Sequence, residues 1–292
     1  MKVACNVAKY TWNGGPPQLG ATASELVRLA EEVGFSTVSA MDHFFQIPGV
    51  GEAEEPMLDG YTFLGFAAGL TSRVNLQLMV TGVTYRHPGL LAKIVTSLDA
   101  LSGGRATLGI GAAWFDREHA ALGVPFPTLS ERFEMLDETL AICRQMWSDD
   151  DGPFDGRHFH LAETMNSPQC VSSPHPPIMI GGQGEKKTLK LVARHAQAVN
   201  LFPIGVEGVS HKLDVLRGHC DDEGTDFDSI RVTLIYRTPD AADRADVDGA
   251  VAELEGYASL GVDEVFVTPG GGDPLSAVER LGAWFLPRVA DL

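Results

Sequence analysis

An aspartate and a histidine stand side by side at Asp42 and His43, directly after a short segment rich in small and β-branched residues. Imidazole is the side chain that most readily gives or takes a proton near neutral pH, and a neighbouring carboxylate can raise its basicity or contact a ligand. A lone histidine is more often structural, so the role of His43 depends on its position in the fold. We interpret His43 as a candidate acid–base residue and Asp42 as a candidate ligand contact.

The segment GGQGE, residues 181–185, is the clearest ligand signal in the chain. Its three glycines let the backbone approach an anion closely, and a helix is expected to begin immediately afterwards, at Glu185. A glycine-rich turn at a helix N-terminus binds anions through unpaired N–H groups and the helix dipole. Lys186 and Lys187 add positive charge. The alternative is a tight turn without a ligand, but three glycines exceed what a turn needs, so we favour a phosphate site.

Glu118 belongs to the segment GIGAAWFDREH, residues 109–119. A dinucleotide-binding fingerprint fails there, because Trp114 replaces the last glycine and a helix follows in place of a strand ending in an acid. The two glycines instead let a planar ring pack closely, with Trp114 and Phe115 either as a wall of its pocket or as core residues. Glu118 either faces that pocket or caps a helix.

A second motif, His158-x-His160, resembles a pair of metal ligands. It lies in an Asp-, Pro- and Gly-rich stretch and has no matching cluster of cysteines or acidic residues. We therefore expect no metal site.

The elements that must position these residues alternate between short β-branched strands and amphipathic helices, which is typical of parallel βα units. Eight strands and eight helices follow in strict order, which favours a closed (β/α)8 TIM barrel over a doubly wound sheet. The strands are expected at 3–8, 35–41, 74–80, 106–110, 177–181, 198–202, 230–236 and 263–268, and the helices at about 21–33, 61–70, 88–101, 129–147, 185–195, 208–223, 246–260 and 274–290. An insertion at about 149–177, with a hairpin around Phe154 and His160, follows the fourth helix. In such barrels the active site lies at the C-terminal ends of the strands, where Asp42, His43, Glu118 and the GGQGE turn all fall.

Composition and charge limit what this barrel can bind. The chain has 292 residues, 44% of them hydrophobic and 21% charged, which suits one domain over residues 1–292. Its formal charge of −17 disfavours nucleic acid and anionic membranes. The four cysteines, Cys5, Cys143, Cys170 and Cys220, lie far apart, and no apolar run suits a signal peptide or a membrane span. We expect a cytoplasmic protein with a small-molecule substrate; a homodimer is compatible with the sequence.

A family resemblance extends over nearly the whole chain. The strings MDHFF (41–45), TYRHPGLLAKIVTSLDALSGGRATLGIGAAW (84–114), REHAALG (117–123), RFEMLDETLAICRQMW (132–147), NSPQCVSSPHPPIMIGGQGEKKTLKLVARHAQAVNLF (166–202) and HKLDVLRGHC (211–220) resemble, in this order, the luciferase-like monooxygenase family. The resemblance is greatest to the branch that uses the deazaflavin coenzyme F420, rather than flavin mononucleotide (FMN).

The resemblance implies a bulge at Met79, Val80, Thr81 and Gly82 that backs the cofactor ring, with a non-prolyl cis peptide at Met79–Val80. By the same match Asp42 contacts the ring and His43 is the catalytic imidazole. The turn Gly181, Gly182, Gln183 and Gly184 would hold the phosphate, although Gln183 stands where close relatives have glycine. Glu118 matches a polar position whose role varies within the family.

The implied reaction is hydride transfer between coenzyme F420 and a small organic substrate, with His43 as the proton donor or acceptor and Glu118 as the next candidate. Entry over Phe44, Phe45, Trp114 and the loop 46–58 would suit a mostly apolar compound. One alternative is an FMN-dependent monooxygenase, and another is a non-catalytic protein that binds a flavin or deazaflavin.

Overall fold

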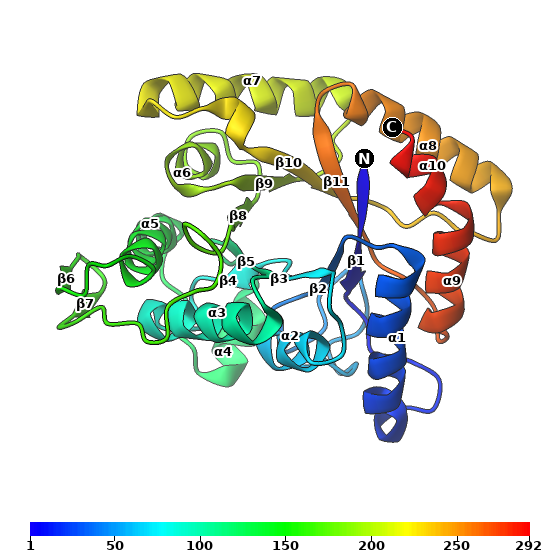
Figure 1. Ribbon diagram of the computed structural model, residues 1–292, viewed down its shortest axis with the longest axis horizontal. Coiled ribbons are helices and arrows are strands. Elements are labelled where there is room, and N and C mark those ends of the chain that lie inside the picture. Colours follow the sequence, from blue (N-terminus) through cyan, green and yellow to red (C-terminus); the bar gives the residue numbers. More distant parts are fainter.

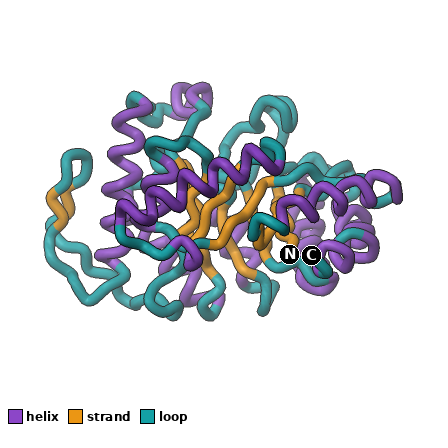
Figure 2. The backbone as a smooth tube through the Cα atoms, turned by 90° about the horizontal axis from the view of Figure 1, so that it is seen from above, coloured by secondary structure: helices purple, strands orange, loops and turns teal.

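The chain forms a closed barrel of parallel strands surrounded by helices (Figures 1 and 2). The computed structural model describes all residues, 1–292. The strands of the barrel are β1 (Lys2–Val7), β2 (Thr37–Ala40), β3 (Asn75–Leu78), β4 (Thr81–Gly82), β5 (Ala106–Gly111), β8 (Ile178–Gly181), β9 (Ala198–Leu201), β10 (Arg231–Ile235) and β11 (Val262–Val267). Because β3 and β4 are two parts of one interrupted strand and both pair with β5, the barrel has eight strand positions, as expected from the sequence.

Helices follow the strands and cover the outside of the barrel (Figure 1). They are α1 (Leu19–Val33), α2 (Gly60–Ala68), α3 (Pro88–Ser102), α4 (Asp116–Leu122), α5 (Leu129–Met146), α6 (Thr188–His195), α7 (Val206–Glu223), α8 (Arg244–Ala258), α9 (Pro274–Trp284) and α10 (Leu286–Ala290), together with short 3-10 turns at Pro16–Gln18 and Phe227–Ser229. None of these helices combines the length and the apolar character needed to cross a membrane.

Three expectations about the elements are corrected. Helix α4 lies between β5 and α5, in a segment expected as loop. The helix after the GGQGE turn begins at Thr188 rather than at Glu185, because residues 185–187 form a turn of their own. The last helix is divided at Phe285, and Pro287 lies in the first turn of the new helix, where its missing N–H costs nothing.

The insertion after α5 carries the expected hairpin, β6 (Phe154–Asp155) and β7 (His160–Leu161), which pair antiparallel. The hairpin lies at the periphery of the molecule in both views (Figures 1 and 2). His158 and His160 each meet a separate carboxylate, Glu134 and Asp155 respectively.

Local sequence explains how the helices around the site begin. Asp59 accepts a hydrogen bond from the N–H of Thr62 and so caps α2. Thr128 and Glu131 form a reciprocal capping box at the start of α5. These two caps fix the helices that follow the loops at the mouth of the barrel.

The interior of the barrel is partly polar. Asn6 and Ser39 are hydrogen-bonded on neighbouring strands at 2.9 Å, and the amide of Asn200 donates to Thr233 at 2.9 Å. Gln77 reaches the sulfur of Met179 at 3.6 Å, although β5 separates their strands. Apolar residues on the outer face of the strands pack against the helices and form the main core. Because these buried polar groups are paired, the floor of the barrel avoids the cost of unsatisfied hydrogen bonds.

Candidate active site

A cavity of about 530 Å³ opens at the C-terminal ends of the strands. Its wall is formed by residues at or near the ends of β2, β3, β4, β5, β8, β9 and β10, and by parts of α5 and α6: Met41, Asp42, His43, Ile47, Met79, Val80, Thr81, Gly82, Tyr85, Gly111, Ala112, Ala113, Trp114, Leu129, Phe133, Leu136, Gly181, Gly182, Thr188, Asn200, Phe202 and Ile235. This is the end at which barrel enzymes carry their chemistry. A hollow of about 660 Å³ between α8, α9 and α10 contains none of the candidate residues.

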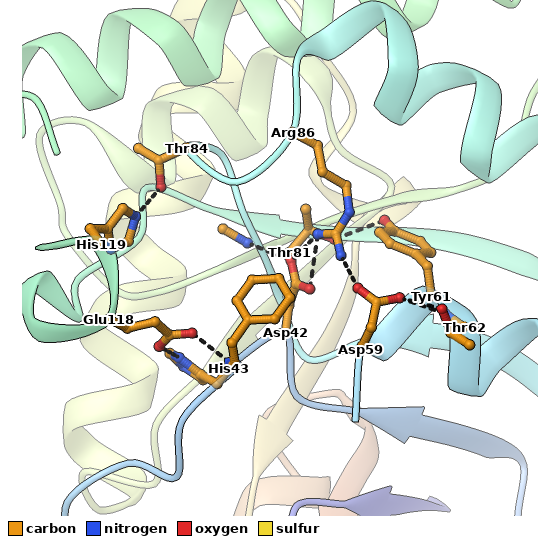
Figure 3. A network of polar contacts seen from close by, with 12 residues as sticks. Asp42, His43, Asp59, Tyr61, Thr62, Thr81, Thr84, Arg86, Glu118 and His119 are labelled. Carbon is orange, nitrogen blue, oxygen red and sulfur yellow. Dashed lines mark hydrogen bonds and ion pairs between the residues drawn. The ribbon is translucent and has the colours of Figure 1, made fainter. Parts of the chain in front are cut away.

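His43 and Glu118 form a hydrogen-bonded pair beside this cavity (Figure 3). Nδ1 of His43 lies 2.8 Å from Oε2 of Glu118, whose side chain is fully buried, while 15% of the His43 side chain is exposed. The other carboxylate oxygen accepts the N–H of Phe44 at 2.5 Å. A carboxylate at Nδ1 favours the tautomer that carries its proton there, which leaves Nε2 as the ring nitrogen that can accept a proton.

Two neighbouring aromatic rings pack against the imidazole of His43. The rings of Trp114 and Phe115 contact it edge-on, at centroid distances of 5.6 and 5.9 Å. Trp114 is itself 56% exposed and lines the cavity, whereas Phe115 is buried. The alternatives left open for these two residues are thereby resolved, since Trp114 is a wall of the pocket and Phe115 belongs to the core.

Asp42 is the centre of a buried ion network (Figure 3). Its carboxylate binds Nη1 of Arg86 through both oxygens, at 2.9 and 2.6 Å, and accepts the N–H of Gly82 at 3.3 Å. Arg86 also binds Asp59 at 2.8 Å. Burial raises the pKa of Asp42 above its usual value, and Arg86 and the Gly82 N–H oppose that rise. The network ties the end of β2 to the β4–α3 loop.

The break between β3 and β4 forms the wall of the cavity that the resemblance assigns to the cofactor ring. The peptide bond Met79–Val80 is cis, as the resemblance implied. Thr81, fully buried, shares a hydrogen bond with the hydroxyl of Tyr61 at 2.8 Å. A Cβ added at Gly111 or Gly181 would come within 3.1 Å of the Val80 methyls. Glycine at these two positions therefore leaves space for Val80 and keeps this side of the cavity flat.

The GGQGE turn forms the far end of the cavity. Gly181 and Gly182 line it together with Thr188, the first residue of α6. Gly182 has a φ of 123°, a conformation that side chains rarely adopt, and the side-chain oxygen of Gln183 is buried without a hydrogen-bond partner. The open backbone and the N-terminus of α6 fit a phosphate at this end, whereas the amide oxygen of Gln183 is an acceptor and offers the phosphate no hydrogen bond.

A family model described as luciferase-like monooxygenase matches residues 8–269. The chain belongs to the luciferase-like monooxygenase family.

Three relatives illustrate how this family varies. An uncharacterised protein of Mycobacterium tuberculosis is 31% identical over 90% of this chain and 94% of its own length. An F420-dependent glucose-6-phosphate dehydrogenase of Kineococcus radiotolerans is 32% identical over 60% of this chain and 54% of its own. An FMNH2-dependent dimethylsulfone monooxygenase of Pseudomonas putida is 22% identical over 92% of this chain and 71% of its own.

Among solved structures, the coenzyme F420-dependent tetrahydromethanopterin reductase of Methanopyrus kandleri shares the fold, with a TM-score of 0.79, 17% identity and coverage of 99% of this chain and 100% of that one. The luciferase-like relatives thus include enzymes named for F420 and for reduced FMN. They support an enzyme of the oxidoreductase class with a flavin-type cofactor, without deciding which one.

Most residues that we selected from the luciferase-like sequence pattern lie together in the structure. Asp42, His43, Met79, Val80, Thr81, Gly82, Gly181 and Gly182 all line the cavity. Gln183 and Gly184 lie in the same turn but are not part of the lining, and Glu118 stands behind His43.

Sequence reasoning gave no role to the partners of Asp42 and missed Phe133 and Phe202 in the wall. Arg86 and Asp59 were passed over because a charged residue in a loop is usually solvated. Phe202 follows directly after the last residue of β9, so the rule that strand ends carry the site would have found it. Phe133 was visible only as part of the apolar face of α5.

Proposed function

We propose that this chain is an F420-dependent oxidoreductase that transfers a hydride between the coenzyme and a small organic substrate, with His43 as proton donor or acceptor. The observation that carries the proposal is the His43–Glu118 pair at the edge of the cavity at the barrel mouth. Reduction of a carbonyl compound needs one hydride and one proton, and the reverse reaction releases both. An oriented imidazole provides the proton.

Other residues of the cavity would hold the cofactor and exclude water. The bulge from Met79 to Gly82 and the glycines at 111 and 181 offer a flat surface for a planar ring, and Gly182 with Thr188 offers the phosphate end. When bound there, reduced F420 supplies the hydride from the central carbon of its ring. Trp114 and Phe133 help to exclude water, and His43 holds or accepts the proton at Nε2.

The FMN monooxygenase is the second candidate, favoured by the FMNH2-dependent relative that matches 92% of the chain. The two functions differ in what the cofactor does with oxygen, since deazaflavin carries hydride and reacts poorly with oxygen.

Titration of the apoprotein with each cofactor, followed by fluorescence quenching, tests the choice. We expect micromolar binding of F420 and turnover of a panel of enones, ketones and quinones by reduced F420 without oxygen consumption. Micromolar binding of FMN without binding of F420 would replace the proposal with the FMN monooxygenase. F420 binding without turnover across a broad panel would instead favour a protein that only binds its cofactor.

A further inference from the structure

The mouth of the cavity carries three large apolar side chains that are more than half exposed. Trp114, Leu129 and Phe202 are 56%, 57% and 52% exposed, and all three line the cavity. They come from three different places, the β5–α4 loop, the first turn of α5 and the end of β9. Exposed apolar groups gathered around one opening mark a ligand-binding surface.

No lysine or arginine lines this cavity. Two arginines lie behind the lining: Arg86 is paired with Asp42 and Asp59, and Arg132 donates to the backbone carbonyls of Ala112 and Pro127. Lys187 lies next to Thr188 at the phosphate end, where it binds Ser130 at 3.0 Å and lies 5.4 Å from the ring centroid of Phe133. A second anionic ligand near His43 would therefore lose its hydration without gaining a cation, in a chain whose formal charge is −17.

The polar groups of the wall are also largely committed. Thr81 is bonded to Tyr61, Asn200 donates to Thr233, and Asp42 is bonded to Arg86. The hydroxyl of Tyr85 also lacks a hydrogen-bond partner but is buried, and Thr188 belongs to the phosphate end. On the side of Trp114, the polar side chain that is partly exposed, and so accessible to a ligand's oxygen, is that of His43.

We infer that the second ligand of this cavity is an uncharged, largely apolar molecule with a single carbonyl or hydroxyl oxygen, which meets His43 while its carbon skeleton lies against Trp114, Leu129 and Phe202. This inference names the substrate class of the proposed oxidoreductase and rests on that function. It separates this chain from the relative named for glucose 6-phosphate, a sugar phosphate that carries both charge and many hydroxyls.

Binding of a neutral dye tests the apolar subsite without any catalysis. The probe is the neutral fluorescent amine aminoanthracene, compared with a sulfonated derivative of the same ring, each titrated into the protein with and without saturating cofactor. We expect the neutral dye to bind at least about 100-fold more tightly than the sulfonate, because the sulfonate would be buried unpaired. Glucose 6-phosphate should leave the bound dye in place. Equal affinity for the two dyes, or displacement of the dye by glucose 6-phosphate, would overturn the inference.

Two matched pairs of variants locate the dye. Phe202→Ser and Leu129→Ser should each weaken its binding about tenfold or more, as expected when apolar contact area is lost from a pocket. Their controls are Phe66→Ser on α2 and Leu101→Ser on α3, which remove side chains of the same types, 44% and 81% exposed, outside the cavity. A variant that adds a cation, Leu129→Lys, should improve binding of the sulfonated dye. Equal losses in the control variants would place the dye elsewhere and contradict the subsite.

The dye measurements also separate this inference from the proposed function. If the dye binds as expected but no carbonyl compound is turned over, the apolar subsite stands and the hydride-transfer function fails. If turnover is found but favours carboxylated or phosphorylated compounds over their neutral analogues, the function stands and the substrate class is wrong.

Discussion

The Nδ1 atom of His43 lies 2.8 Å from a carboxylate oxygen of Glu118, a residue that is 75 positions further along the chain and fully buried. The pair brings together the end of β2 and the first turn of α4. Because the second carboxylate oxygen accepts the backbone N–H of Phe44, Glu118 fixes both the ring of His43 and the backbone next to it. Glu118 thereby acts through His43, as a positioning residue.

Replacing Glu118 with glutamine should reverse the tautomer of His43. The amide oxygen can still accept the Phe44 N–H, but the amide NH2 then donates to Nδ1 and leaves the proton on Nε2. We expect turnover to fall by about 100- to 10,000-fold with cofactor affinity nearly unchanged. Nitrogen NMR of the labelled imidazole is the decisive measurement, because it reports which ring nitrogen of His43 carries the proton. A variant with the tautomer of the wild type would show that Glu118 only supports the fold.

Removing the imidazole itself separates catalysis from binding. For His43→Ala we expect cofactor affinity within roughly tenfold of the wild type and a loss of turnover of about 100- to 10,000-fold. His160→Ala in the exposed β6–β7 hairpin is the control and should change neither quantity. Full activity of His43→Ala would assign the proton to another group, and loss of cofactor binding would make His43 a binding residue.

The Asp42–Arg86 pair should contribute to stability as well as to the site. Asp42→Ala leaves a buried guanidinium with only Asp59 as partner, and breaking such a pair costs about 3–5 kcal/mol. Urea unfolding measures this loss. The double variant Asp42→Leu with Arg86→Met removes both charges and should recover part of the lost unfolding free energy. Cofactor affinity measured on that double variant then tests whether Asp42 contacts the ring, because weakened binding in a stable protein would no longer reflect misfolding.

The phosphate end is best tested at Thr188. A valine at Gly182 would be strained by the φ of 123° as well as blocking a ligand, so Gly182→Val mixes two effects. Thr188→Val keeps the shape of the side chain and removes only the hydroxyl, and it should weaken cofactor binding by about tenfold. Thr188→Ser restores the hydroxyl and should restore affinity. If valine binds the cofactor as well as threonine does, the hydroxyl does not contact the phosphate.

Acid should weaken the contact between α5 and α6. His195 and Arg194 hold the pKa of Asp137 below its ordinary value of 3.8, first through the 2.7 Å hydrogen bond from His195. The folded state therefore binds fewer protons than the unfolded state, and this stabilisation is present above pH 3.8 and lost as the pH falls below it. Asp137→Asn should show a smaller fall in unfolding free energy between about pH 5 and pH 3 than the wild type. Parallel curves for the two proteins would contradict this assignment.

The barrel could be predicted from sequence because each of its units repeats the same signal, a β-branched strand followed by an amphipathic helix. The GGQGE turn and the Asp42–His43 pair were visible because strand ends carry the site in this architecture. The partners of Asp42 were not visible, since Arg86 is 44 residues away and only the closed fold brings the two together. Helix α4 was missed because seven residues with two acids in the first turn carry little apolar periodicity.

Some expectations remain predictions: the cytoplasmic location, the homodimer and the assignment of single residues to the cofactor ring.

The barrel closes where its first strand meets its last. Lys2 to Cys5 of β1 pair with Glu264 to Val267 of β11, so the contact that seals the cylinder joins residues more than 250 positions apart in sequence. Because such long-range pairing can form only after most of the chain is available, a growing chain on the ribosome keeps both strand edges unpaired until nearly all of it has emerged. Protection of the nascent chain from aggregation during that interval should therefore matter more for the yield of this protein than the stability of any single βα unit.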